Sequence, residues 1–583
     1  MASNDPTKRE TKASSPNSAD SETGLTDTAA GAYPPRDEGA PTSPDGPLSA
    51  HVIDEMASAV CSPQAAEPPP PNDREAADFP RNDLGNARRL IHRHGHDLLF
   101  VDAAGWFDWD GRRWQPPPAK RTPEAQKRAH QTVEAIVNEA RALQSELDED
   151  LASGRLNAND KSHAEVIEDR KERISAHRKF AIASGNSGRI AAMLTEAEPY
   201  LRRAAADLDA DAYLFNVSNG TLVLGPVAKD GTVTIGIRPH HRLDLITHMS
   251  PVAYDPDATA PRFLKFLEQI LPNPEIRLFL QILLGYCVTG DVSEQVMALL
   301  HGTGANGKST VLKIVAAVFG DYAITLPIQT FLADERRSGG DATPDLARLP
   351  GTRLAMASEP ERGSRLSEAV VKTITGGERV VARRLFEGQF EFDPSFKLIL
   401  SANEKPRITG QDEGIWRRVI LVPFDIFITR SERNRKLFNT LLAELPGILN
   451  WLLDGYRLWR ERGLVIPEVL VAATDQYRAE SDPVGEFLRV CTNEAEHAQL
   501  RAKDLYDVYA LWCRHNAINP ISSNAFGRRL SDRGVHKETV QVVYYALALT
   551  EEGSRLFEEL RRRSSKEGGE GTASGSNSGK LEE

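Results

Sequence analysis

Cysteine is scarce in this sequence of 583 residues, and long apolar runs are absent. The cysteines show neither metal-ligand spacing nor an evident pairing scheme, which indicates reduced thiols; they are Cys61, Cys287, Cys491 and Cys513. No apolar run approaches about 18 residues, so we expect no helix that spans a membrane and no membrane partner. The N-terminus also lacks the charged-then-apolar order of a signal peptide, which predicts a soluble protein of the cytoplasm.

Negative charge and proline are concentrated at the N-terminal end of the chain. Residues 1–80 contain 13 of the 36 prolines and carry a net charge of −9, out of −12 for the whole chain. Such a segment cannot bury enough apolar surface to fold alone, so we expect a disordered leader. Because the remaining residues are close to neutral, the overall acidity does not argue against nucleic-acid binding. The Gly/Ser-rich stretch Ser564–Glu583 is also expected to be disordered.

A phosphate-binding pattern lies near the middle of the chain, between a predicted strand ending at His301 and a predicted helix reaching Phe319. From Gly302 to Ser309 the sequence reads glycine, four free positions, glycine, lysine and serine, in the context that this motif requires. The glycines allow a tight turn whose N–H groups face the phosphates of a nucleoside triphosphate. We expect Lys308 to reach the β- and γ-phosphates and the Ser309 hydroxyl to hold Mg²⁺. The predicted nucleotide-binding residues are Gly302, Thr303, Gly304, Ala305, Asn306, Gly307, Lys308, Ser309 and Thr310.

Two later apolar runs end in polar side chains suited to ATP hydrolysis. The run from Gly351 predicts a strand ending in Glu359, a candidate to hold the Mg²⁺ ion or to polarise the attacking water, with Glu361 in reserve. The run from Phe396 predicts a buried strand ending in Asn403, which we expect to orient the water or to sense the γ-phosphate. An asparagine that only turns the chain after a strand is the simpler alternative. The order of these elements after the phosphate loop favours the catalytic interpretation.

Two adjacent arginines, Arg417 and Arg418, directly precede another predicted strand. In a ring of subunits such an arginine can reach the γ-phosphate bound by the neighbouring subunit. We therefore expect one of the pair to be an arginine finger supplied in trans, which makes a homo-oligomer necessary for hydrolysis.

Between the acid and Asn403, two alternating runs flank Glu387 and Gly388 and predict a β-hairpin. Its basic residues suit the phosphate backbone of single-stranded DNA, and a hairpin that only presents them to solvent is the alternative. The predicted DNA contacts here are Lys372, Arg379, Arg383 and Arg384.

An aromatic stretch from Trp106 to Trp114 contains the two-residue turn signal Asp110-Gly111. Its interleaved tryptophans and arginines allow a platform on which bases stack. We favour the simpler interpretation, a small sheet that packs its indoles inward.

Taken in order, these motifs resemble the phage and plasmid primase-helicase family, which joins a poxvirus-type N-terminal region to a motor of helicase superfamily 3. The matching stretches are Asp83–Ala87, Asn216–Gly220, Gly302–Ser309, the strand ending in Glu359, Lys372–Arg384, Lys397–Asn403 and Arg417-Arg418. The resemblance implies a hexameric, AAA+-like ring that uses ATP and Mg²⁺ to move along single-stranded DNA and to unwind forked duplex. It also implies that Lys308, Ser309, Glu359 and Asn403 form the active site, completed by Arg417 or Arg418.

Larger members of this family carry a primase domain at the N-terminus. The leader of this chain is too polar to form such a domain, so we expect no primase activity in this polypeptide and a separate primase or polymerase as a partner. If a phage or plasmid encodes the chain, the bacterial cytoplasm is its expected location.

The C-terminal part predicts a separate small unit. Predicted helices at Lys503–His515 and Asn524–Arg533, followed by a strand pair across Glu538–Leu549, give the order of a winged-helix domain. The second of these helices carries basic side chains suited to a DNA groove, although a basic helix that faces solvent is the alternative. The residues concerned are Arg528, Arg529 and Arg533.

The fold class predicted is α/β, with an AAA+-like P-loop ATPase core of helicase superfamily 3, an α+β N-terminal domain and a C-terminal winged-helix domain. The chain is too long for one hydrophobic core. The predicted boundaries are 1–80 for the leader, 81–255 for the α+β domain, 256–292 for a helical collar, 293–428 for the ATPase core, 429–480 for a helical closing segment, 481–563 for the winged helix and 564–583 for the tail.

The function expected is that of a replicative DNA helicase. A DNA-binding initiator or scaffold that uses ATP only to assemble is the main alternative, and a motor that packages duplex DNA is another. Strand displacement separates the helicase from the scaffold, and a preference for single-stranded DNA as ATPase stimulant separates it from the packaging motor.

Overall fold

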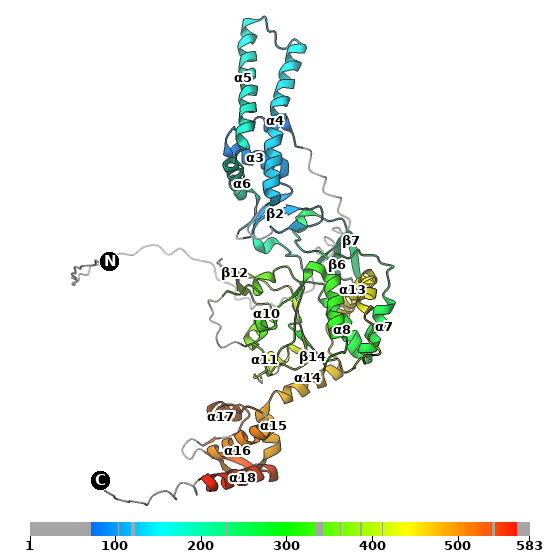
Figure 1. Ribbon diagram of the computed structural model, residues 1–583, viewed down its shortest axis with the longest axis vertical. Helices are drawn as coiled ribbons and strands as arrows, with labels where there is room; N and C mark the ends of the chain where they lie inside the picture. Colours follow the sequence, from blue (N-terminus) through cyan, green and yellow to red (C-terminus); the bar gives the residue numbers. More distant parts are fainter. Residues whose placement is uncertain are drawn as a thin grey trace, which may run out of the picture. The chain divides into compact units, whose positions relative to one another are not determined.

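A computed structural model gives the chain a mixed α/β fold that contains a parallel sheet (Figure 1). It describes residues 71–102, 104–117, 123–228, 231–333, 342–361, 363–384, 388–410, 412–516, 518–535, 537–538 and 543–567. Most of the predicted leader and of the predicted C-terminal tail lie outside these ranges. Within them, no helix is both long enough and apolar enough to cross a membrane.

The N-terminal region is built on a long helical hairpin (Figure 1). Helices α4 (Pro123–Ala152) and α5 (Lys161–Ser184) run antiparallel and pack against each other. Helices α3 (Asp83–His94) and α6 (Ser187–Leu201) pack together and against α4. Their apolar residues form a small core that includes the fully buried Leu90.

Residues 71–80 already belong to the folded part that the structure describes, so the predicted end of the leader at residue 80 is wrong. Helix α2 (Asp73–Ala76) starts at Asn72, whose side chain accepts hydrogen bonds from two backbone N–H groups of the helix. Ala77 then packs with apolar residues of α4 and α5. The proline-rich composition that predicted disorder ends at Pro71, and the last residues of the segment are held by contacts with helices far along the sequence.

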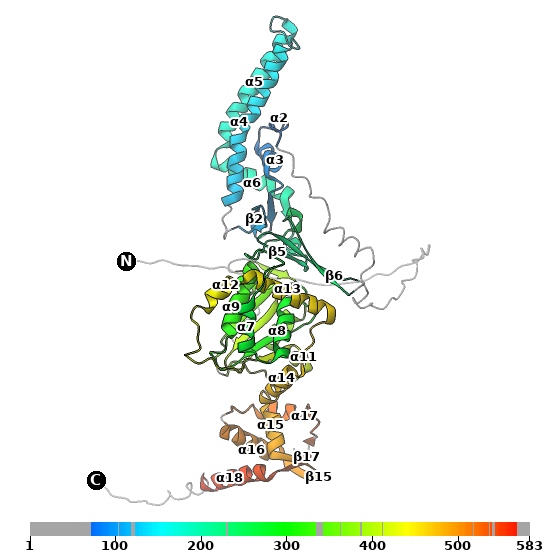
Figure 2. The same ribbon diagram turned by 90° about the vertical axis from the view of Figure 1, so that its right-hand side faces the viewer.

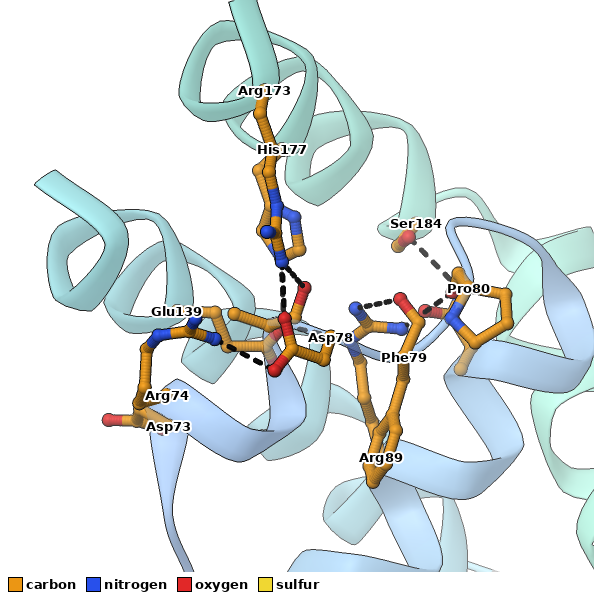
Figure 3. A network of polar contacts seen from close by, with 12 residues as sticks. Asp73, Arg74, Asp78, Phe79, Pro80, Arg89, Glu139, Arg173, His177 and Ser184 are labelled. Atoms are coloured by element: carbon orange, nitrogen blue, oxygen red, sulfur yellow. Dashed lines mark hydrogen bonds and ion pairs between the residues drawn. The ribbon is translucent and has the colours of Figure 1, made fainter. Parts of the chain in front are cut away.

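A buried ion cluster joins α3, α4 and α5 (Figure 3). The fully buried Glu139 carboxylate accepts hydrogen bonds from Arg89 Nε at 2.8 Å and Arg93 Nη2 at 2.9 Å, and His177 Nε2 lies 2.8 Å from its Oε2. The other nitrogens of Arg89 donate to the carbonyls of Phe79 and Pro80. Burial alone raises the pKa of Glu139, but the His177 hydrogen bond and the charge of Arg89 outweigh it, so the net pKa is lowered. The cluster fixes the base of the hairpin.

We expect Glu139→Ala to destabilise the N-terminal region by about 3–5 kcal/mol, because it leaves the buried Arg89 without a carboxylate and Arg93 with Asp73 alone. Native-state hydrogen exchange of α4 in the full chain measures this loss as a lower free energy of local opening. The matched control is Glu134→Ala, which removes an exposed carboxylate from the same helix and should change that free energy by about 0.5 kcal/mol or less. Equal effects of the two substitutions would contradict a stabilising role for the cluster.

The predicted aromatic sheet is present, and its indoles are buried. Strands β1 (Leu98–Val101), β2 (Gly105–Trp109), β3 (Trp114–Gln115) and β4 (Arg202–Arg203) form a sheet in the order β3-β2-β1-β4. Trp106, Trp109 and Trp114 are 5%, 7% and 4% exposed. Inward packing of the indoles is therefore confirmed, and they offer no surface for bases to stack on.

A three-stranded antiparallel sheet and two helices precede the parallel sheet along the chain. The strands are β5 (Leu214–Val217), β6 (Gly220–Val227) and β7 (Val233–Arg238), and the helices are α7 (Pro261–Ile270) and α8 (Pro274–Tyr286). Their buried residues belong to the same apolar core as one face of the parallel sheet. Both helices begin with proline at the first helical position, which suits a residue without an N–H.

The central sheet contains five parallel strands in the order β14-β8-β13-β10-β9. The strands are β8 (Met297–His301), β9 (Ala323–Thr325), β10 (Leu354–Ser358), β13 (Lys397–Ala402) and β14 (Val419–Pro423). Along β8, Ala298 and Leu300 enter one apolar core, whereas Met297 and Leu299 enter the other. A sheet buried on both faces explains why these strands read as continuous apolar runs.

Helices cover the two faces of this sheet. One face carries α7, α8, α9 (Lys308–Phe319) and α13 (Leu445–Arg462), which Figure 2 shows in front of the strands. The other face packs against α10 (Glu368–Thr375) and α14 (Glu468–Glu480). The short helix α12 (Leu437–Leu442) contacts α9. The sheet is thereby fixed on both sides, and its strand ends are free to carry functional side chains.

The C-terminal unit contains helices and a small antiparallel sheet with strand order β15-β17-β16. Its elements are α15 (Pro483–Cys491), β15 (Thr492–Arg501), α16 (Ala502–His515), α17 (Ser523–Ser531), β16 (Lys537–Glu538), β17 (Val543–Leu549) and α18 (Glu551–Glu567). The sequence of β15 is polar and lacks the alternation that predicts a strand. The strand forms because the segment pairs with β17.

Two predicted boundaries in this unit are wrong. Helix α17 ends at Ser531, so Arg533 lies after the helix and not on it. Helix α18 continues to Glu567, three residues beyond the predicted start of the tail at Ser564. In the second case the glycines of the tail begin only at residue 568, and α18 continues to Glu567, the residue directly before them.

Candidate nucleotide-binding site

The phosphate loop connects the carboxyl end of β8 to the first residue of α9. Gly304 and Gly307 adopt φ angles of +100° and +86°, which favour glycine. A Cβ atom on Gly307 would lie 2.7 Å from Ile270 Cγ2 of α7, and one on Gly302 would lie 2.3 Å from the Phe424 carbonyl oxygen. Ala305 also has a positive φ, of +50°, at a position where the sequence offers no glycine. The loop conformation therefore depends on the glycines of the motif.

The chain after β14 wraps around the loop and holds it in place. The Asn306 side chain is buried, and its Nδ2 donates to the Phe424 carbonyl at 3.1 Å. Four residues later, Ile428 N donates to the Ala305 carbonyl at 2.8 Å. These two contacts link residues more than a hundred positions apart, and no local pattern in the sequence predicts them.

Lys308 is 3% exposed, and its Nζ turns back toward the loop. It donates to the Gly302 carbonyl at 2.6 Å and to Asn403 Oδ1 at 3.2 Å. Burial lowers the pKa of the Lys308 ammonium below its ordinary value, and the nearby Glu359 carboxylate opposes the shift. The structure thus brings Lys308 and Asn403 into contact, with Glu359 close enough to act on the charge.

Glu359 follows β10 with a φ of +62°, an uncommon conformation for a residue with a Cβ. Its N–H donates to the Ser401 carbonyl of β13 at 2.9 Å, which fixes the backbone, and its side chain is exposed. Glu361 is exposed two residues further on. Because β8, β13 and β10 are neighbours in the sheet, their carboxyl ends place Lys308, Asn403 and Glu359 at one edge.

Ser309 and Glu359 are the residues here that could hold Mg²⁺. Both are exposed, and neither side chain forms a hydrogen bond to another described residue. Among the residues that the structure describes, no group of three or more His, Cys, Asp and Glu residues could hold a metal ion. One hydroxyl and one carboxylate fit Mg²⁺ that is held mainly by phosphate oxygens and water, as is usual for a nucleotide-bound ion.

The arginine pair lies at the opposite edge of the sheet. Val419, which follows the pair, is in register with Met297 at the start of β8, whereas Pro423 is in register with His301 at its end. Five strand residues separate the two edges, a length of about 16 Å. Within one protomer, neither arginine is therefore placed beside Lys308.

The two arginines have different surroundings. Arg417 is exposed, and its Nη2 donates to Gln295 Oε1 at 3.2 Å. Arg418 is 9% exposed, and its Nη1 donates to the Gly414 carbonyl of α11 (Glu413–Trp416) at 2.6 Å. Burial lowers the pKa of Arg418, and the charge of Arg417 adds to the shift. The sequence does not distinguish between them, but only Arg417 is accessible from outside the protomer.

The hairpin predicted between the acid and Asn403 is present as β11 (Val380–Arg383) and β12 (Gln389–Phe392), although Glu387 lies outside the described residues. Several of its basic side chains have partners within the chain. Arg379 lies 3.3 Å from Asp393, and the Arg384 guanidinium lies 5.1 Å from the Phe390 ring centroid. The prediction that Lys372 belongs to the hairpin is wrong, because Lys372 lies on α10, where its Nζ is 3.0 Å from Asp412. The prediction from the sequence left out Glu391 of β12 and Asp393 directly after it, two acids that make the hairpin mixed in charge. Its contact with DNA stays a prediction.

The C-terminal arginines also differ from one another. Arg528 on α17 is exposed, and Arg529 is partly buried. Arg533 forms an ion pair with Asp482 at the start of α15, and its Nη1 donates to the Arg529 carbonyl at 3.0 Å. Arg533 therefore stabilises the C-terminal unit internally, and Arg528 is the residue best placed to contact a ligand.

Two family models match the chain. Residues 87–272 match the family described as D5 N terminal like, and residues 300–418 match a family of unknown function (DUF5906). The second match covers the phosphate loop, Glu359, Asn403 and the arginine pair.

Several viral proteins are similar to this chain. "Putative helicase L207/L206" of Acanthamoeba polyphaga mimivirus is 30% identical over 53% of this chain and 34% of its own length. "Putative helicase 022R" of Frog virus 3 (isolate Goorha) is 27% identical over 44% of this chain and 28% of its own length. "Putative primase C962R" of African swine fever virus (isolate Warthog/Namibia/Wart80/1980) is 27% identical over 36% of this chain and 22% of its own length. The chain thus spans about a third or less of each of these relatives.

Among solved structures, "The A form apo structure of NrS-1 C terminal region-CTR" covers 52% of this chain and 78% of that chain, at 11% identity and a TM-score of 0.34.

Proposed function

Because the chain belongs to the D5-like primase-helicase family, which confirms the resemblance that its motif order indicated, we propose that it is an ATP-dependent replicative DNA helicase. The observation that carries the proposal is the convergence of Lys308, Asn403 and Glu359 at the carboxyl ends of three adjacent parallel strands. The strand order, in which the phosphate-loop strand lies between the last strand and the Asn403 strand, supports an AAA+-like motor of helicase superfamily 3.

In this proposal the loop N–H groups and Lys308 bind the phosphates of ATP, and Ser309 and Glu359 hold Mg²⁺. The ion would neutralise the negative charge that develops on the phosphate oxygens during hydrolysis. Lys308 is already aligned by the Gly302 carbonyl and by Asn403, so little ordering is needed when the phosphates arrive. The Glu359 carboxylate, exposed at the sheet edge, can orient the attacking water. Asn403 contacts Lys308 directly, which suits a residue that responds to the presence of the γ-phosphate.

The position of the arginine pair supports a site shared between subunits. Since Arg417 is exposed at the edge opposite the phosphate loop, it can act only on a nucleotide bound by a neighbouring protomer. This supports a homo-oligomeric ring, for which we propose six subunits by analogy with superfamily 3. Such a ring would enclose single-stranded DNA and act at forks together with a separate primase or polymerase.

The β11–β12 hairpin and the C-terminal unit are the proposed DNA contacts. The order of α15, β15, α16, α17, β16 and β17 is that of a winged helix, with α17 and its Arg528 in the place of the groove-reading helix. The hairpin lies between the Glu359 and Asn403 strands along the chain, so that nucleotide-driven movement of either strand end would be passed to it.

We expect the double substitution of Arg383 and Arg384 by serine to lower the affinity for single-stranded DNA. It should also reduce the slope of log affinity against log salt concentration by about one to two, the equivalent of one or two phosphate contacts. The reason is that each lost cation no longer displaces a counterion from the backbone. Fluorescence anisotropy with a labelled oligonucleotide at several salt concentrations measures both quantities. The matched control replaces Arg178 and Lys179, two adjacent exposed cations of α5, and should leave the salt slope unchanged. An unchanged slope in the hairpin variant would remove this element from the DNA path.

The experiment that tests the whole proposal measures ATPase activity and unwinding of tailed duplexes by the full chain, with the oligomer mass recorded in the same buffer. A helicase shows ATPase activity stimulated by single-stranded DNA and displaces the annealed strand. Binding of forked DNA without displacement would favour an initiator or scaffold, and stimulation by duplex alone would favour a packaging motor.

A further inference from the structure

Phe427 is exposed immediately beside the phosphate loop. It is 61% exposed, which is unusual for a phenylalanine, and it lies in the segment that follows β14. The residues on both sides of it are fixed to the loop, because the Phe424 carbonyl accepts from Asn306 and Ile428 N donates to Ala305. The backbone that carries this ring is therefore held against the site, while most of the ring surface is exposed.

The sheet order shows toward which part of a bound nucleotide this ring lies. Lys308 Nζ contacts Asn403 after β13, and Glu359 follows β10, so the groups that act on the γ-phosphate lie on the β13 side of β8. Strand β14 borders β8 on the other side, and the segment from Phe424 to Ile428 continues from it. A triphosphate with its γ end toward β13 therefore directs its base toward the β14 side, where Phe427 is exposed.

We propose that Phe427 is the stacking platform for the base of the bound nucleotide. The inference rests on the proposed function, because it takes the phosphate loop as the site of a nucleoside triphosphate, and it adds a residue that no motif of the sequence includes. Phenylalanine presents an apolar face without hydrogen-bonding groups, so it binds a base through its ring surface and favours the larger purine rings over pyrimidines. The ligand class is accordingly a purine nucleoside triphosphate.

The test compares ATP with a ligand that has the phosphates but no base. Isothermal titration calorimetry on the full chain measures the affinities for Mg²⁺ with a slowly hydrolysed ATP analogue and for Mg²⁺ with inorganic tripolyphosphate. Loss of one base–aromatic stacking contact corresponds to a loss of about five- to 150-fold in affinity. We expect Phe427→Ala to lose this factor for the ATP analogue and to keep its affinity for tripolyphosphate. Phe427→Tyr, which keeps the ring, should bind both ligands as the unchanged protein does.

The matched control is Tyr200→Ala, which removes an aromatic ring with the same exposed fraction of 61% from α6 and should alter neither affinity. An equal loss for both ligands in Phe427→Ala would show that the residue only supports the loop, and no loss for either would show that the base lies elsewhere; both results overturn the inference. If the unchanged protein binds neither ligand, the proposed phosphate site fails, which is distinguishable from failure of the stacking role. A changed oligomer mass with unchanged ATP affinity would assign Phe427 to a subunit contact and would also overturn it.

Discussion

The Lys308→Ala protein is expected to fold normally and to lose ATP turnover by at least about a hundredfold. Loss of a positioned cation from a site that stabilises transferring phosphoryl groups has an effect of about this size. Folding should survive because the substitution removes a buried charge together with its hydrogen bonds to Gly302 and Asn403, and leaves no other buried charge without a partner. Steady-state phosphate release measures turnover, and circular dichroism of the same sample measures folding.

The matched control for this prediction is Lys313→Ala, on the same helix but exposed. It removes the same charge about one helical turn further along α9 and should leave turnover within about twofold. A Lys308→Ala protein with unchanged turnover would refute the assignment of the loop as the catalytic site. A Lys313→Ala protein with equally low turnover would mean that the effect is a general one of charge on this helix.

Replacing Arg417 by alanine is expected to reduce hydrolysis by about 10³- to 10⁵-fold while ATP still binds, the range seen for arginine fingers. The reason is positional: Arg417 lies at the amino edge of the sheet and is exposed, so it is absent from its own protomer's site and available to the next. Arg418→Ala should act differently. Because Arg418 is buried and donates to the Gly414 carbonyl, its loss should lower the melting temperature before it alters binding.

Mixing the two variants distinguishes a shared site from a site within one subunit. A Lys308→Ala subunit still offers Arg417, and an Arg417→Ala subunit still offers Lys308, so a mixed oligomer contains interfaces in which both groups are intact. We expect partial recovery of turnover that depends on the mixing ratio. The control is a subunit with both substitutions, which should rescue neither single variant. Absence of recovery at every ratio, with mixed oligomers present by native mass spectrometry, would contradict the trans assignment.

The fold could be predicted from the sequence to the extent that patterns are local. The strands around Leu299, Ala355 and Ile399 read as continuous apolar runs because both faces of a parallel sheet are buried, and all three are present. Two elements that were not predicted give no local signal in the sequence. Helix α2 and strand β15 form through contacts with elements distant in the sequence, and neither has an apolar periodicity of its own.

The sequence by itself determined which residues form the candidate site, because the order of the glycine loop, Glu359, Asn403 and the arginine pair is written along the chain. Only the tertiary structure decided how they are arranged. Strand order places Asn403 against Lys308 and separates Arg417 from both, and burial distinguishes Arg417 from Arg418. The same holds for Phe427, whose position beside the loop depends on two hydrogen bonds between distant segments. A pattern in sequence reports on local propensity and burial, whereas distances between sites depend on which strands become neighbours when the chain folds.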